Sequence, residues 1–174
     1  MASELRVDKI VPVDGVPTGG GGGIVQVVHE TRTTSFTTTN TAYVDYMSVT
    51  ITPKFSTSKM SVRYGLYSST NGDVAHTYSS MFRNDTQIGG ATDAGNRTAA
   101  ASVHNTATQQ MTFGGSEHLD SPATTSAITY KIKVKSSNGQ TVTFNRSYRD
   151  NNAGAYDGRA CLLYTSPSPR DAES

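Results

Sequence analysis

The chain has 174 residues, which is enough for one domain with its own core and too few for two. Its net charge of +1 gives no basis for nucleic-acid binding, because affinity for phosphate backbones needs clustered Lys and Arg. Hydrophobic residues make up only 34% of the chain, a low share for a helical bundle. A thin β-sandwich, or a subunit that completes its core against neighbours, tolerates this composition better.

The polar part of the composition favours β-structure. The chain contains 25 Thr, 20 Ser and 16 Gly. Thr is β-branched and suits a half-exposed pleated surface, whereas Ser and Gly suit the turns between strands. This composition is typical of extracellular or virion β-proteins and unusual for cytosolic enzymes.

The N-terminal part predicts a short strand and a flexible joint. Residues 5–11 alternate apolar and polar side chains, and Pro12 ends the run because proline cannot donate to a β-ladder. Residues 14–18 and the glycine run 19–23 then predict a linker. We therefore expect an N-terminal stub over residues 1–18, a Gly linker over 19–23, a head domain over 24–160 and a tail over 161–174.

Two features bear on where the protein is made. The first four residues lack the basic start and apolar core of a secretory signal. No apolar run approaches the roughly 18 to 20 residues that a membrane helix needs. We expect synthesis in a cytoplasm and no membrane insertion.

The first half of the head predicts several strands. Residues 24–28 are apolar and β-branched, and the Thr-rich stretch 31–41 either extends that strand or forms a surface strand. Residues 43–52 alternate, which places Tyr43, Met47, Val49 and Ile51 on one face, with Asp45 as the polar exception. Residues 60–67 alternate again and place Met60, Val62, Tyr64 and Leu66 on the dry face.

The second half continues the pattern. Residues 77–82 predict a strand, residues 83–88 a tight turn into a short strand, and residues 98–110 a long loop or weak strand. Residues 111–119 predict a strand with a bulge at Gly114 and Gly115. Residues 128–135 and 141–148 predict a hairpin closed by a type I′ turn at 137–139. The core-facing residues of this hairpin are Ile128, Tyr130, Ile132, Val134, Val142 and Phe144.

These elements predict an all-β fold. No segment of ten or more residues has a helical apolar stripe. Eight to ten short strands in two sheets indicate an antiparallel β-sandwich with a jelly-roll-like head, preceded by a short strand and a Gly-rich linker.

The last residues differ from the rest. Residues 161–172 contain two prolines two positions apart and resemble a translated sequencing-adapter artefact. On this interpretation the native sequence departs after Ala160, and a natural disordered tail is the alternative. Cys161, the one cysteine of the chain, then has no functional meaning, and a single cysteine allows no internal disulfide.

Eight short stretches share a characteristic order and spacing, namely residues 5–10, 24–28, 43–45, 48–53, 83–86, 119–126, 130–134 and 145–147. Together they resemble a family of virion structural proteins from tailed bacteriophages, especially those recovered in metagenomic aquatic samples. The resemblance implies a tail-fibre or tail-tip subunit, a homotrimer located in the virion and made in the host cytoplasm. Its N-terminal stub would contact other virion proteins, and its β-rich head would meet a host-surface glycan or protein.

The sequence contains no recognisable catalytic, cofactor or metal site. His29, His76, His104 and His118 are scattered without metal-ligand spacing. Ser116 and His118 lack a nucleophile elbow, Asp150 and Asp157 lack the spacing of a calcium loop, and the glycine run lacks the Lys-Ser/Thr of a phosphate loop. We predict a protein that is not an enzyme, with no cofactor and with receptor-binding residues that the sequence does not identify.

Two rival functions remain open. A carbohydrate-binding module would use exposed aromatic residues, for which Tyr67, Tyr78, Tyr148 and Tyr156 are available beside polar loops. A small glycan hydrolase would need two carboxylates across a cleft, for which Asp45, Glu117 and Asp120 are the candidates by default.

Overall fold

The computed structural model describes Ile24 and residues 26–71, 75–92, 95–105, 110–151 and 158–160. The expected stub, the Gly linker, the tail with Cys161, and Tyr156 and Asp157 lie outside these residues. The described residues contain nine strands and no helix, and therefore no helix that could cross a membrane.

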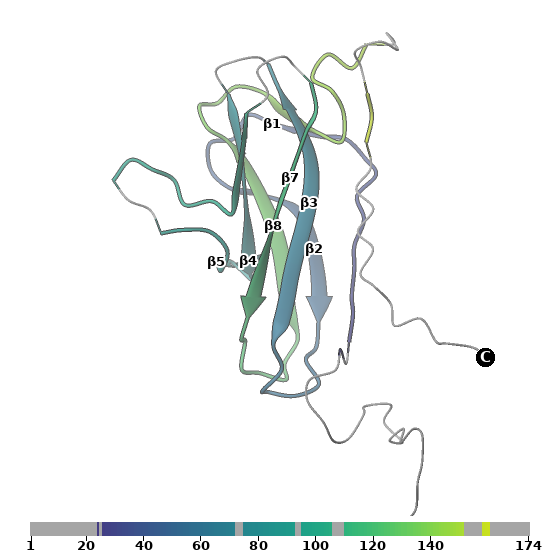
Figure 1. Cartoon of the computed structure of the whole chain (residues 1–174), viewed down its shortest axis with the longest axis vertical. Helices are drawn as coiled ribbons and strands as arrows, with labels where there is room; N and C mark the ends of the chain where they lie inside the picture. The colour runs from purple at the N-terminus through teal and green to yellow at the C-terminus, as the bar shows by residue number, and fades with distance from the viewer. Residues whose placement is uncertain are drawn as a thin grey trace, which may run out of the picture.

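The strands form two antiparallel sheets packed face to face, which confirms the predicted β-sandwich (Figure 1). Sheet A has the order β1-β9-β3-β7 and is built from Phe36–Thr38 (β1), Val142–Phe144 (β9), Met60–Thr70 (β3) and Thr112–Asp120 (β7). Sheet B has the order β2-β8-β4-β5 and is built from Val44–Ile51 (β2), Ile128–Ser136 (β8), His76–Arg83 (β4) and Thr86–Gln87 (β5). The remaining strand, β6 (Ser102–Asn105), pairs with β4 beside β5.

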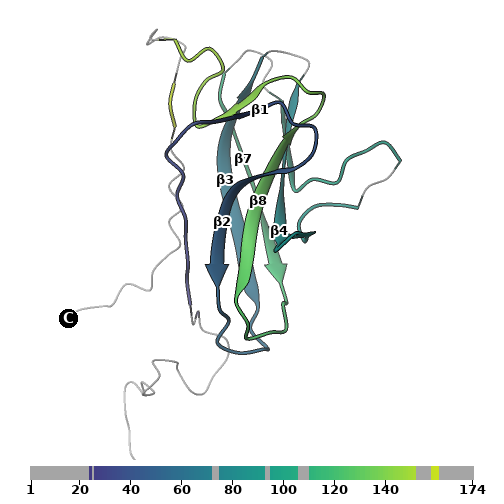
Figure 2. The same ribbon diagram turned by 180° about the vertical axis from the view of Figure 1, so that it is seen from behind.

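The strands are paired as in a jelly roll. Strands β1 and β9, β2 and β8, β3 and β7, and β4 and β6 form nested antiparallel pairs, as if one long hairpin were rolled into two sheets. Seen from behind, β2, β8 and β4 lie in front of β3 and β7 (Figure 2). Two further pairings, β3 with β9 and β4 with β8, join the nested pairs within each sheet.

The predicted hairpin near the C-terminus is wrong. Strand β8 lies in sheet B and β9 lies in sheet A, so the turn between them crosses from one sheet to the other. Gly139 has a positive φ of 81°, whereas Asn138 is not among the residues with positive φ, so the turn is not type I′. The residues of the turn predicted that the chain would return beside β8 in the same sheet. Instead, Val142 and Phe144 belong to sheet A and are fully buried in the core that faces sheet B.

Strand β2 contains a bulge that the sequence did not predict. Its register with β8 shifts between Asp45 and Met47, so Tyr46 turns inward and is only 3% exposed. The expectation that Tyr43 and Asp45 share a face with Met47 is therefore wrong. By contrast, β7 pairs with β3 without interruption through Gly114 and Gly115, so the predicted bulge there is also wrong.

The strand predicted at residues 24–28 is wrong as well, because Ile24 and residues 26–28 belong to no strand. Residues 26–35 instead form an extended segment, here called the strap, which runs beside β2 before the chain enters β1 (Figure 1). The other strand predictions from residue 43 to residue 136 are confirmed within a few residues. The dry faces predicted for residues 60–66 and 128–134 are the inner faces of β3 and β8.

The interior is apolar in part and hydroxyl-rich in part. Leu66, Met81, Val134, Val142 and Phe144 form the centre of one apolar cluster. Ile51, Ile128 and Tyr130 form a second, smaller cluster. The inner faces of β3, β4 and β8 also bury small hydroxyl residues, namely Ser68, Thr70, Thr77, Ser79 and Ser136. This interior explains how a chain with a low apolar content fills a sandwich.

A histidine fills the space that a glycine leaves. His104 on β6 is buried, its Nε2 lies 2.6 Å from Ser102 Oγ, and burial lowers its pKa so that the ring stays neutral. A Cβ on Gly114 of β7 would lie 1.7 Å from His104 Cε1. Gly114 is thus required for packing between the sheets and not for a bulge.

We therefore expect Gly114→Ala to reduce the free energy of unfolding by about 2 kcal/mol, because overpacking forces neighbouring groups out of place. Urea denaturation measures the change. Ser116→Ala, two residues along the same strand, is the matched control and should cost less. Combining Gly114→Ala with His104→Ala should recover part of the loss; no recovery would show that the His104 ring is not the obstacle.

Candidate functional site

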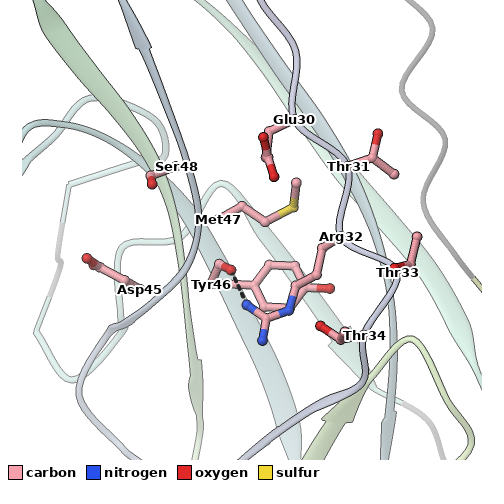
Figure 3. A pocket seen from close by; sticks show the side chains of 9 residues that line it. All are labelled: Glu30, Thr31, Arg32, Thr33, Thr34, Asp45, Tyr46, Met47 and Ser48. Carbon is pink, nitrogen blue, oxygen red and sulfur yellow. Dashed lines mark hydrogen bonds between the residues drawn. The ribbon is translucent and has the colours of Figure 1, made fainter.

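An open groove with a volume of about 490 Å³ lies between the strap and β2. The strap supplies Glu30, Thr31, Arg32, Thr33 and Thr34, and β2 supplies Asp45, Tyr46, Met47 and Ser48 (Figure 3). Both walls come from extended backbone, so their side chains alternate between the groove and the flanks. The lining combines hydroxyls, two carboxylates and one guanidinium.

Arg32 crosses this groove and fastens the strap to the sheet. Its Nη1 donates to the carbonyl oxygen of Tyr46 at 2.6 Å (Figure 3). Its guanidinium carbon lies 4.9 Å from the ring centre of Phe36 and 5.0 Å from that of Tyr46. Because β2 is an edge strand of sheet B, this hydrogen bond covers a carbonyl that would otherwise be available to another chain.

Asn145 holds the strap from the other side. This residue follows β9, has a positive φ of 62° and is buried. Its Nδ2 donates to the carbonyl oxygens of Arg32 at 2.9 Å and Thr34 at 3.1 Å. Burial raises the pKa of the neighbouring Tyr46, with the charge of Arg32 opposing the rise. The groove therefore contains a neutral phenol and a structurally engaged guanidinium.

Below the strap lies a smaller apolar hollow of about 80 Å³. Val28 of the strap closes it against Val49 of β2, Val62 of β3 and Tyr130 of β8. Strand β9 pairs with β3 only over Ser68–Thr70. Within the part of the chain that the structure describes, no strand pairs with residues 60–66 on that side of β3. This side of the sandwich is thus closed by side chains and the strap, without a β-ladder.

The three carboxylates considered for hydrolysis lie in three different places. Asp45 is on the outer face of sheet B with Lys131 and Lys133, at 3.1 and 3.2 Å. Glu117 is on the outer face of sheet A, and Asp120 is buried between the sheets. No two of them face each other across a cleft, which removes the specific residues on which the hydrolase hypothesis rested.

The lysines of β8 form a charge-balanced network. Lys131 and Lys133 each contact Asp85 at 3.0 Å as well as Asp45. Hydrogen bonds from the two lysines lower the pKa of Asp85. For Asp45, the two lysines outweigh the opposing effect of partial desolvation and lower its pKa. The positive charge of these two lysines is therefore neutralised locally, and they do not form a free basic patch.

Asp120 ties the two sheets together. Arg83 Nη1 of β4 donates to both of its oxygens, at 2.9 and 3.0 Å, and the Tyr130 hydroxyl of β8 donates to Oδ2 at 2.7 Å. Burial and the adjacent carboxylate raise the pKa of Tyr130. Asp120 is thus a structural group, since its oxygens are engaged by neighbours within the fold.

Two other residues named in the sequence analysis, Asp150 and Tyr78, also lie apart from the groove. Asp150 pairs with Arg159 at 3.1 Å and with Arg146 at 3.8 Å. Tyr78 lies on the outer face of sheet B, with Lys135 over its ring at 5.4 Å. No group of three or more His, Cys, Asp or Glu residues suited to a metal occurs among the described residues.

The groove itself was not predicted. Arg32 is the one cation in the Thr-rich stretch 31–41, and nothing in its spacing indicates that it would cover a sheet edge. The alternation expected for residues 43–52 places Tyr46 opposite the face of Met47, and the bulge changes the phase of that alternation. Comparisons with protein-family models, with curated proteins and with solved structures found no match.

We expect Arg32→Ala to loosen the strap, since it removes a hydrogen bond to a backbone carbonyl and two ring contacts. A loss of about 1.5 to 3 kcal/mol in the free energy of unfolding follows from the usual contribution of charged hydrogen bonds. Hydrogen exchange should accelerate at residues 28–34. Arg32→Lys is the control that keeps the charge but loses the planar stacking; equal exchange in wild type and Arg32→Ala would contradict the role.

Asp120→Ala should cost about 2 kcal/mol or more, because it leaves the Tyr130 hydroxyl and the Arg83 guanidinium without their acceptor. Asp120→Asn keeps the shape and part of the hydrogen bonding, so its loss should be smaller. Asp85→Ala, which removes an exposed partner of two lysines, is the matched control and should leave the melting temperature nearly unchanged. Equal melting temperatures for Asp120→Ala and Asp85→Ala would disprove the inter-sheet role.

Proposed function

We propose that this chain is a structural protein of a tailed-bacteriophage virion, a tail-fibre or tail-tip subunit that contributes to adhesion to the host surface without catalysis. The head, residues 24–160, provides the adhesive surface. The stub, residues 1–18, provides the contact with other virion proteins. The subunit acts as a homotrimer, so that weak sites on each head add by avidity.

The observation that carries this proposal is the incomplete closure of the sandwich. Strand β3 is 11 residues long, yet β9 and β1, which continue sheet A beside it, have 3 residues each. Large apolar side chains are also exposed on several other surfaces, namely Ile24, Val27, Phe55 and Val103. Such a surface favours a subunit that is completed by neighbours over a solitary domain. The order and spacing of the phage-like stretches point in the same direction.

A carbohydrate-binding module of a secreted protein is the second candidate. The exposed Phe113, in contact with Tyr67 on the outer face of sheet A, is the specific observation in its favour. A jelly roll supports both functions, since this architecture occurs in capsid proteins and in lectins. The two candidates differ in the oligomeric state that they require.

The mass of the full chain in solution tests the proposal. Light scattering after size exclusion should give about three times the 18.5 kDa of one chain. A stable monomer at high concentration would contradict the fibre subunit and favour the solitary module. Incubation with purified host polysaccharide should release no reducing ends, and release would contradict the absence of catalysis.

A further inference from the structure

The outer face of the β3–β7 pair presents four rows of side chains. The register places Ser61 opposite Leu119, Arg63 opposite Glu117, Gly65 opposite Gly115, and Tyr67 opposite Phe113. These residues alternate with the inward Val62, Tyr64 and Leu66, so they all point away from the core. Figure 1 shows β3 and β7 in front of sheet B, with this outer face towards the viewer.

The third row contains no side chains. A Cβ on Gly115 would lie 2.2 Å from the carbonyl oxygen of Tyr64, so any larger residue would push the two strands apart. The gap is therefore a fixed property of this strand pair. It separates an aromatic row from a charged row that lies four residues away along the strand, about 13 Å at the usual rise of a β-strand. Between them lie the partly exposed backbone of Gly115 and the buried backbone of Gly65.

At one end of the gap stands an exposed aromatic pair. Phe113 is 58% exposed, and its ring centre lies 5.3 Å from that of Tyr67 at an interplanar angle of 59°. An aromatic ring of this exposure on a sheet face offers a flat apolar surface to a ligand. The axial C–H groups of a pyranose ring form a complementary apolar face.

At the other end stands an exposed ion pair with spare hydrogen-bonding capacity. Arg63 Nη2 contacts Glu117 Oε1 at 3.0 Å, and Ser61 Oγ donates to the same oxygen at 2.8 Å. The side chains of Arg63 and Glu117 are 47% and 57% exposed. Arg63 has further N–H donors and Glu117 has a second oxygen. Together they present a donor and an acceptor side by side, which matches two adjacent sugar hydroxyls.

We propose that this face, consisting of Ser61, Arg63, Gly65, Tyr67, Phe113, Gly115 and Glu117, binds a neutral hexopyranose unit of a surface glycan. One ring packs on Phe113, and hydroxyls of the same or the adjoining unit reach Arg63 and Glu117 across the glycine row. A neutral sugar fits because the ion pair carries no net charge. The inference rests on the proposed adhesive function and deepens it by naming the ligand class and the residues.

A second copy of the chain fits this face less well. Its two exposed apolar residues, Phe113 and Leu119, lie at opposite ends of the strand, separated by the glycine row and the ion pair. Specific protein interfaces bury about 800 Å² per partner around a desolvated apolar centre. Here the centre is a charged pair and a glycine row, which suits a small polyol better than a protein surface.

Two variants of the full chain test the site, with two controls. Phe113→Ala removes the ring, and Glu117→Gln removes the charged acceptor. Leu119→Ala lies on the same strand and face outside the site, and Phe55→Ala removes an exposed ring elsewhere. The probes are cellobiose, lactose, maltose and N,N′-diacetylchitobiose, titrated at millimolar concentration into ¹⁵N-labelled protein while amide shifts are recorded.

At least one sugar should shift the amides of Gly65 and Gly115. Phe113→Ala and Glu117→Gln should weaken that binding at least tenfold, while both controls stay within twofold and all variants keep the wild-type melting temperature. The proposal is overturned if none of the four sugars moves these amides. It is also overturned if the variants lower the mass of the assembly, which would assign the face to a second copy.

The same variants separate this inference from the proposed function. If the full chain adsorbs to host cells and Phe113→Ala adsorbs equally well, the result supports the adhesive function and contradicts this site. If the sugars bind at Gly65 and Gly115 but the chain adsorbs to no cells, the result supports the site and contradicts the adhesive role in the virion.

Discussion

Polar side chains in the interior hold the two sheets of this sandwich together. Tyr64 of sheet A shares a hydrogen bond of 2.8 Å with Ser79 of sheet B, and its pKa is raised to about 12 by burial, which the hydrogen bond to Ser79 partly offsets. Asp120 of sheet A accepts from Arg83 and Tyr130 of sheet B. Burying a polar group costs free energy, and a hydrogen bond offsets that cost. These contacts therefore fix how the sheets face each other where apolar packing is sparse.

This interior has a consequence for the edges of the sheets. Small hydroxyl residues bury little apolar area, so the sandwich depends more on closure of its open side. There the strap, fastened by Arg32 and Asn145, replaces a strand beside β2. A side chain can cover a backbone carbonyl without extending the β-ladder, which also limits pairing with other chains. The outer faces are left for charge-balanced pairs and a few exposed rings.

Alternation predicted most strands because it depends on neighbours along the chain. It failed where a contact from elsewhere changes the phase or the partner. The bulge at Tyr46 turns that ring onto Phe144, with ring centres 4.9 Å apart. The sequence predicted a bulge at Gly114 because glycine interrupts a strand pattern. In the structure, this glycine instead leaves room for His104, a residue from the other sheet. The surface that carries Phe113 and Glu117 was not recognised, since its rows exist only once β3 and β7 are in register.

The sequence by itself determined that the head is an antiparallel β-sandwich, because composition and period-two alternation are local properties. It also determined which faces of β3 and β8 are dry. Only the tertiary structure decided that β8 and β9 belong to different sheets, since a turn sets the chain direction but not which edge the next strand joins. It likewise decided where Asp45, Glu117 and Asp120 lie, because the distance between side chains far apart in sequence depends on strand order and register.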